Sequence, residues 1–162
     1  MKKYIAVLLS LLLLLGGCSA PAPIPEETLR FYYCTADAGF DSDAVSIQAE
    51  MREIRAFDTT ESIIRTYLSG PTNEGLASPF PSGVKLISLA EEESTFFITL
   101  SEEFAKLSNL ELTMACSCLA LTILDMTDAD YVSISAENSL LNGQQTIIFD
   151  RNAVLLQDAA VE

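Results

Sequence analysis

The sequence of 162 residues contains no histidine and no tryptophan, and its 9 basic residues stand against 23 acidic ones. Without histidine the chain cannot form the Ser-His or Cys-His pairs of many hydrolases, nor a histidine-ligated metal centre. The net charge of -14 at pH 7 repels nucleic-acid phosphates, so we expect no nucleic-acid partner. The length fits one domain.

The first residues predict export. Lys2 and Lys3 precede an apolar run over residues 5–15 that is too short to span a bilayer. The run ends in Leu-Gly-Gly-Cys at residues 15–18, the pattern of a bacterial lipobox. An ordinary signal peptide and a short membrane anchor are the alternatives, but the cysteine at the cleavage position favours a lipoprotein. We expect a signal peptide over residues 1–17 and a lipid such as palmitate on Cys18.

The mature chain would then begin at Cys18 on the extracytoplasmic face of the cell membrane, with the membrane reached through that lipid. Loss of two lysines leaves 7 basic residues against 23 acidic ones, a net charge of -16. Residues 18–27 contain three prolines among small residues and predict an extended tether. The folded body is expected over residues 28–150, followed by a tail over 151–162.

Apolar alternation and helix-capping residues divide the body into strands and helices. The expected strands cover residues 29–35, 45–57, 84–89, 95–100, 131–135 and 146–149. The expected helices cover residues 58–70 and 108–126, and a short helical turn begins at residue 101. Two helices must cover all these strands. We therefore expect an α+β fold, a single small domain with one mixed β-sheet and both helices packed on one face.

Four local patterns support these boundaries. Asp58 with Glu61 predicts a capping box for the first helix, which ends at Ser69-Gly70-Pro71. Ser108 with Glu111 predicts a second capping box, and Asn142-Gly143 predicts a tight turn.

The remaining cysteines are Cys34, Cys116 and Cys118. On a helix, Cys116 and Cys118 would point about 200° apart and could not pair with each other. We expect both to be small apolar residues of a buried helix. A disulfide between Cys34 and one of these two cysteines is an alternative, because an exported domain permits disulfides.

Candidate chemical groups are few. The spacing of Asp37, Asp41 and Asp43 does not match a calcium-binding EF-hand loop, so we expect a solvated turn and no metal site. The acids at 91–93 and the pair at 102–103 could act in acid/base catalysis, but such runs are typical of solvated surfaces and first helical turns. We expect no catalytic residues and no enzyme. Four tyrosines could contact a sugar: Tyr32, Tyr33, Tyr67 and Tyr131.

Three stretches carry a family resemblance. They are Leu-Ser-Gly-Pro-Thr-Asn-Glu-Gly at residues 68–75, Ser-Pro-Phe-Pro-Ser-Gly-Val-Lys-Leu at 78–86 and Leu-Ser-Glu-Glu-Phe at 100–104. Together they resemble the GerM-type (GerMN) sporulation and spore germination domain over about residues 29–149. Val84 replaces the usual threonine. The prototype resembles two such domains in tandem, whereas this chain has room for one.

The resemblance implies a fold similar to ring-building-motif domains, no catalytic residues and no cofactor. It implies a lipid-anchored extracytoplasmic domain with a protein-interaction or scaffolding role in sporulation, spore germination or peptidoglycan assembly at the cell envelope. Its partners would be envelope or sporulation proteins, and a homo-oligomer is a further alternative. The alternative is a solute- or glycan-binding envelope lipoprotein.

Overall fold

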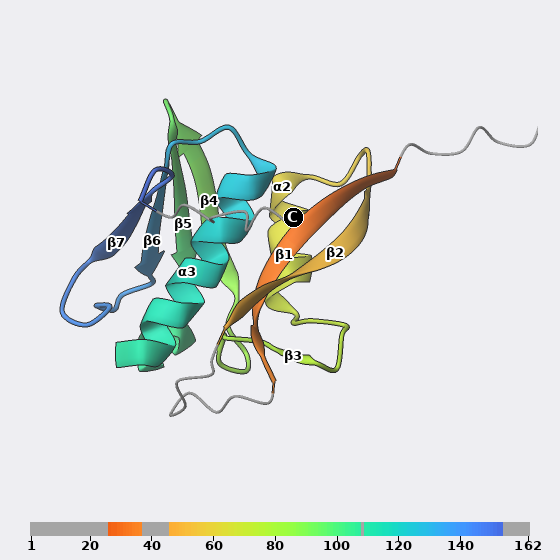
Figure 1. The fold of residues 1–162 in the computed structure, drawn as a ribbon. Helices are drawn as coiled ribbons and strands as arrows, with labels where there is room; N and C mark the ends of the chain where they lie inside the picture. The colour runs from red at the N-terminus through yellow and green to blue at the C-terminus, as the bar shows by residue number, and fades with distance from the viewer. Residues whose placement is uncertain (1–25, 37–45, 108, 154–162) are drawn as a thin grey trace, which may run out of the picture.

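The computed structural model describes residues 26–36, 46–107 and 109–153, which form two sheets and two α-helices (Figure 1). One sheet has the order β2 (Ile47–Arg55), β1 (Glu26–Thr35), β3 (Leu76–Ala77). The other has the order β4 (Leu86–Glu92), β5 (Thr95–Leu100), β6 (Tyr131–Ala136), β7 (Thr146–Asp150). The helices are α2 (Thr60–Leu68) and α3 (Asn109–Met126), with the 3-10 helix η1 (Glu102–Lys106) between them. The signal peptide, Cys18 and residues 18–25 of the expected tether lie outside the described residues.

The α+β class with two helices is confirmed, but the expectation of one sheet is wrong. The cause lies in β1, whose residues 31–34 are all buried. Phe31 and Tyr33 belong to the main core together with α2, whereas Tyr32 and Cys34 pack on the opposite face against α3. β2 also pairs along one edge of β1, and β3 pairs with the other edge at Cys34 and Thr35. With helices against both of its faces, β1 lies in a layer separate from β4–β7.

The four-stranded sheet is mixed. β4 and β5 form an antiparallel hairpin, β5 pairs in parallel with β6, and β7 returns antiparallel to β6. The expected hairpin is confirmed, but β4 continues to Glu92, so the connection is shorter than residues 90–94. Phe96, Ile98 and Leu100 alternate with more exposed residues along β5. Their buried face is the one that contributes to the main core.

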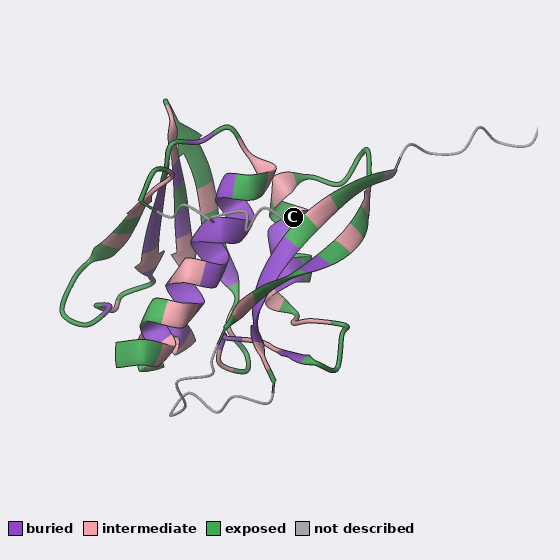
Figure 2. Ribbon diagram, in the orientation of Figure 1, coloured by how far each residue is buried: buried purple, intermediate pink, exposed green. Residues whose placement is uncertain are grey.

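Helix α3 connects the two parallel strands and lies between the two sheets (Figures 1 and 2). It contacts β1 on one side and β6 and β7 on the other. Ten of its 18 residues are buried, so it is apolar on several sides. Among the described residues it is also the one helix whose length and composition would suit a membrane span. Its burial between the sheets identifies it as a core helix of this domain.

The first helix is capped one residue later than expected. Thr59, with extended backbone angles, is the N-cap of α2, and its side-chain oxygen accepts a hydrogen bond from the Ser62 amide. Asp58 instead accepts from the Arg55 amide at 3.0 Å and closes the turn that follows β2. The expected helix end is confirmed, since Gly70 has a φ of +99°. Ser108 of the second expected capping box lies outside the described residues.

The contact between α3 and β1 gives a test of this architecture. The buried Thr122 hydroxyl accepts from the Tyr32 amide at 3.1 Å and donates to the Cys118 carbonyl at 2.9 Å. Thr122→Val keeps the shape but removes this acceptor, so we expect a loss of about 1–2 kcal/mol in the free energy of unfolding. Urea denaturation measures it. Thr113→Val is the control, because that exposed hydroxyl only donates within its own helix; an equal loss in both variants would contradict the assignment.

Candidate functional site

The structure places the acidic candidates on the surface. Glu91, Glu92 and Glu93 are exposed at the end of the β4–β5 hairpin. Glu102 and Glu103 occupy the first turn of η1. A hydrogen bond from the Ser101 side chain, with help from the residue's own amide, lowers the pKa of Glu103. A carboxyl group that serves as a general acid near neutral pH needs a raised pKa, so this shift has the wrong direction.

The tyrosines separate into two groups. Tyr32, Tyr33 and Tyr67 are buried in the core. The Tyr67 hydroxyl donates to the Tyr32 carbonyl at 2.7 Å, and the Tyr33 hydroxyl donates to the Tyr67 carbonyl at 2.9 Å. Burial raises the pKa of Tyr33 and of Tyr67, which keeps both hydroxyls protonated as donors. Only Tyr131 of the four is exposed, at the start of β6.

The buried carboxylate of Glu50 organises the loop that follows α2. Its side chain is 8% exposed and projects from the middle of β2. One oxygen, Oε1, accepts from the Thr72 amide at 2.9 Å, the Thr72 hydroxyl at 2.6 Å and the Asn73 amide at 2.8 Å. The other, Oε2, accepts from Arg52 Nε at 2.9 Å. A buried charge is tolerated when it is paired and hydrogen-bonded in this way.

Arg52 extends the same network. Its Nη2 atom donates to the Gly70 carbonyl at 2.7 Å, and its guanidinium lies 5.4 Å from the centre of the Phe31 ring. Glu50 and Arg52 are two apart on a strand, so both side chains lie on one face. That face meets the loop at Gly70, Thr72 and Asn73. The sequence analysis did not identify this pair. The signal in the sequence was an acidic and a basic residue two positions apart in an expected strand, which places them on the same face.

The other two motif stretches meet in the aromatic core. Phe80, between two prolines, packs edge-on against the Tyr67 ring at 5.3 Å between centroids. It also lies 6.3 Å from the Phe104 ring of η1. Ser101, one residue before η1, accepts from the Lys85 amide through its hydroxyl and donates from its own amide to the Lys85 carbonyl. These two stretches therefore form one packed and hydrogen-bonded unit, which contacts α2 at Tyr67, the residue before the first stretch.

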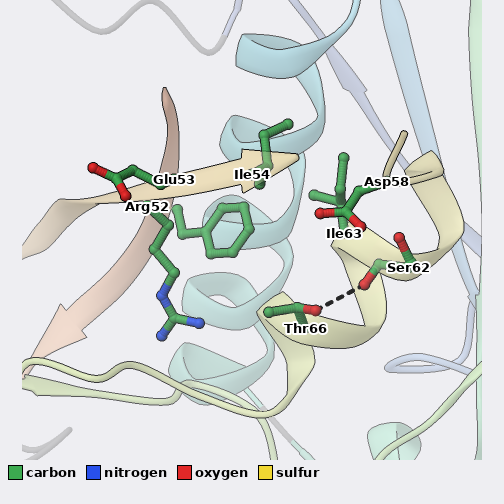
Figure 3. Close-up of a pocket in the computed structure, with 8 residues that line it drawn as sticks. Arg52, Glu53, Ile54, Asp58, Ser62, Ile63 and Thr66 are labelled. Carbon is green, nitrogen blue, oxygen red and sulfur yellow. Dashed lines mark hydrogen bonds between the residues drawn. The ribbon is translucent and has the colours of Figure 1, made fainter. Parts of the chain in front are cut away.

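A hollow lies between β2 and α2 (Figure 3). Arg52, Glu53 and Ile54 line it from the strand side, and Ser62, Ile63 and Thr66 line it from the helix. Its volume is about 120 Å³, and a neighbouring hollow next to the β2–α2 turn measures about 160 Å³. Both are smaller than the roughly 300–1,000 Å³ of sites for small molecules. A hollow of about 350 Å³ on the β6–β7 connection has no ionisable side chain among its lining residues.

The described residues contain no group of three or more His, Cys, Asp or Glu side chains that could hold a metal ion. Asp37, Asp41 and Asp43 lie outside the described residues. Cys34, Cys116 and Cys118 are free thiols and all are buried.

The second face of the four-stranded sheet carries exposed apolar side chains. Phe97 of β5 and Ile148 of β7 both flank Ser133 of β6 in the strand register. Strand alternation places Tyr131 on the same face, two residues before Ser133. Phe97, Tyr131 and Ile148 are 40%, 40% and 64% exposed. Between them lie small polar residues.

Glu50→Gln tests the loop network. The amide cannot accept the charge-assisted hydrogen bonds equally well, so we expect a loss of about 2–3 kcal/mol in the free energy of unfolding at pH 7. Burial raises the pKa of Glu50, but the hydrogen bonds from Thr72, Asn73 and Arg52 outweigh it and hold that pKa below its ordinary value. A lowered pKa in the folded state stabilises the fold above the unfolded pKa, near 4.3, and this stability is lost as pH falls through the folded value.

The stability difference between the parent and Glu50→Gln should therefore shrink as pH falls from about 5 towards 3. Urea denaturation at several pH values measures it. Glu53→Gln is the matched control, since Glu53 is exposed on the same strand. A constant difference across this pH range would contradict the role of the Glu50 charge.

Comparison with known proteins identifies the family and the fold of this chain. A family model described as Germane, sporulation and spore germination, matches residues 30–142. Among solved structures, the tandem GerMN domains of the sporulation protein GerM from Bacillus subtilis superpose with a TM-score of 0.60 at 16% identity. That match covers 81% of this chain and 47% of the tandem protein, so this chain spans about half the tandem length.

The first GerMN domain of the same Bacillus subtilis protein gives a TM-score of 0.56 at 14% identity, covering 76% of this chain and 95% of that domain. No curated protein sequence matches this chain. At these identities the structures establish the fold alone, and the family model establishes membership. The resemblance seen in the three motif stretches is confirmed, and the chain belongs to the Germane family of sporulation and spore germination domains.

Proposed function

We propose that this protein is a lipid-anchored, non-catalytic domain on the extracytoplasmic face of the cell membrane, where it binds envelope or sporulation proteins. Its role would be scaffolding during sporulation, spore germination or peptidoglycan assembly. The observation that carries the proposal is the exposed face of the four-stranded sheet, formed around Phe97, Tyr131 and Ile148. Family membership and the lipobox at residues 15–18 supply its cellular setting.

The chemistry of the described residues favours contact over catalysis. The acids considered for catalysis are exposed, or partly exposed in the case of Glu103, and the family motif residues form hydrogen bonds and core packing. Large aromatic and aliphatic side chains surrounded by polar ones are typical of the centre of a protein interface. Glu92 and Asp150 are the charged residues that strand alternation places on this face, so it carries acids and no base among the described residues. We therefore expect a partner with apolar side chains flanked by basic ones.

Chemical crosslinking of the tethered protein in native membranes tests this function. We expect the parent chain to retain an envelope protein, and the double variant Phe97→Asp with Ile148→Asp to lower its yield at least about tenfold, the effect of ~1.4 kcal/mol. Phe57→Asp is the control, because Phe57 is 63% exposed but lies on the turn before α2. Circular dichroism checks that all variants fold.

Retention of the same protein by the double variant would exclude this face as the contact. If the parent retains no envelope protein but binds soluble peptidoglycan fragments, the glycan-binding alternative replaces the proposal.

Cys18→Ala tests the anchor. The thiol of Cys18 is the acceptor for lipid in a lipobox, so the variant should incorporate no fatty acid and should keep its signal peptide. Growth with a palmitate analogue followed by gel fluorescence measures incorporation. Cys34→Ala serves as the control and should label like the parent, since that thiol is buried in the domain. Labelled Cys18→Ala protein would overturn the lipoprotein assignment.

A further inference from the structure

Strand β1 and helix α3 meet in a regular series of contacts. Arg30 pairs with Asp125, with an Nη2–Oδ1 distance of 2.6 Å. Two residues later on the strand, the Tyr32 amide donates to Thr122 Oγ1 at 3.1 Å. The next residue of the same face is Cys34. Positions on the helix decrease as positions on the strand increase, so the two elements run antiparallel across this contact.

The spacing of the series brings Cys34 to Cys118. Two strand residues advance about 6.6 Å, and three or four helix residues advance about 4.5–6 Å, so the steps match. From Thr122, one helical turn leads back to Cys118, whose carbonyl accepts from the Thr122 hydroxyl at 2.9 Å. Cys34 and Cys118 belong to one small apolar cluster that also contains Tyr32 and Leu121. Both cysteines are fully or almost fully buried there.

Cys116 lies on another side of α3. It is also buried, but it belongs to the main core, which faces the four-stranded sheet. The rotation of about 200° between positions two apart on a helix accounts for this separation. Geometry therefore selects Cys118 as the neighbour of Cys34 from two cysteines that the sequence left equivalent.

We propose that Cys34 and Cys118 are a site of disulfide formation that joins β1 to α3. The reaction is exchange with a small-molecule disulfide. The thiolate of one cysteine attacks a sulfur of the donor, forming a mixed disulfide and releasing one donor thiolate. The second cysteine, as thiolate, then attacks the protein sulfur of that mixed disulfide and releases the other donor thiol. The two cysteines are oxidised with loss of two protons, and the donor is reduced to two thiols.

The thiols are unequal as nucleophiles. A hydrogen bond from the Cys118 thiol lowers the pKa of Cys34 despite burial. The same hydrogen bond, together with burial, raises the pKa of Cys118. The thiolate is the attacking species, so Cys34 performs the first exchange. Burial of both sulfurs restricts this exchange to the folding chain or to a locally opened state of the β1–α3 contact.

The disulfide would act as a staple between distant parts of the sequence. Cys34 and Cys118 are 84 positions apart, and closing a long loop restricts the unfolded chain strongly. It would add a covalent link beside the Arg30–Asp125 and Tyr32–Thr122 contacts. The proposal concerns the domain alone and does not rest on the proposed function.

Refolding under defined redox conditions tests the proposal. The full chain carrying Cys18→Ser, which removes a fourth thiol, is refolded in detergent with mixed oxidised and reduced glutathione. We expect an intact mass lower by two hydrogen atoms, and a proteolytic peptide pair joining Cys34 to Cys118. The melting temperature should be roughly 10 °C higher than after reduction. Cys34→Ala and Cys118→Ala, in the same background, should keep the reduced mass and show no effect of reductant.

Cys116→Ala is the matched control, because Cys116 is equally buried on the same helix. It should form the linked pair as the parent does. Two results would overturn the proposal: native circular dichroism with all three thiols still reactive after denaturation, or fragment spectra of the linked peptides that place the bond on Cys116. The peptide map of the protein that keeps both Cys34 and Cys118 tests the disulfide even if an alanine variant fails to fold.

Discussion

The buried carboxylate of Glu50 is the constraint on which the rest of the structure depends. Its oxygens are the common acceptor for a loop beyond α2 and for the Arg52 guanidinium. An ionised group at this depth is stable only while its partners are in place. It therefore fixes the path of residues 70–73 against β2. That path in turn sets where the chain re-enters the core, at Leu76 and then Phe80.

The Glu50 network and the aromatic core together explain the structural roles of the family motif residues. Thr72 is the hydroxyl that Glu50 requires, Gly70 permits the left-handed backbone after α2, and Phe80 joins Tyr67 to Phe104. None of these residues presents a reactive group to an open pocket. The motif residues therefore serve the hydrogen bonding and packing of the fold.

Much of the fold follows from local pattern, because strand alternation and helical stripes report which side chains are buried. Six strands, both helices, the Gly70 helix end and the hairpin were predictable for that reason. The two-residue strand β3 was not predicted, because it is too short to show alternation. The division into two sheets was not, since the run at residues 31–34 shows burial but not that helices cover both faces. The Glu50 network was also missed, because its loop partners Thr72 and Asn73 are 22 and 23 residues away in the sequence. The neighbour of Cys34 likewise depends on the register between strand and helix, which no single segment encodes.

The antiparallel pair of β1 and β2, here called the β1–β2 ribbon, makes different kinds of contact on its two faces. On one face, Glu50 and Arg52 bind the loop after α2 through charge-assisted hydrogen bonds. On the other, Tyr32 and Cys34 meet α3 through Thr122 and Cys118. The first depends on pH, because it requires an ionised carboxylate, and the second depends on redox state if the thiols pair. Neither uses a side chain from the exposed face around Phe97 and Ile148, so substitutions on that face should leave both of these contacts intact.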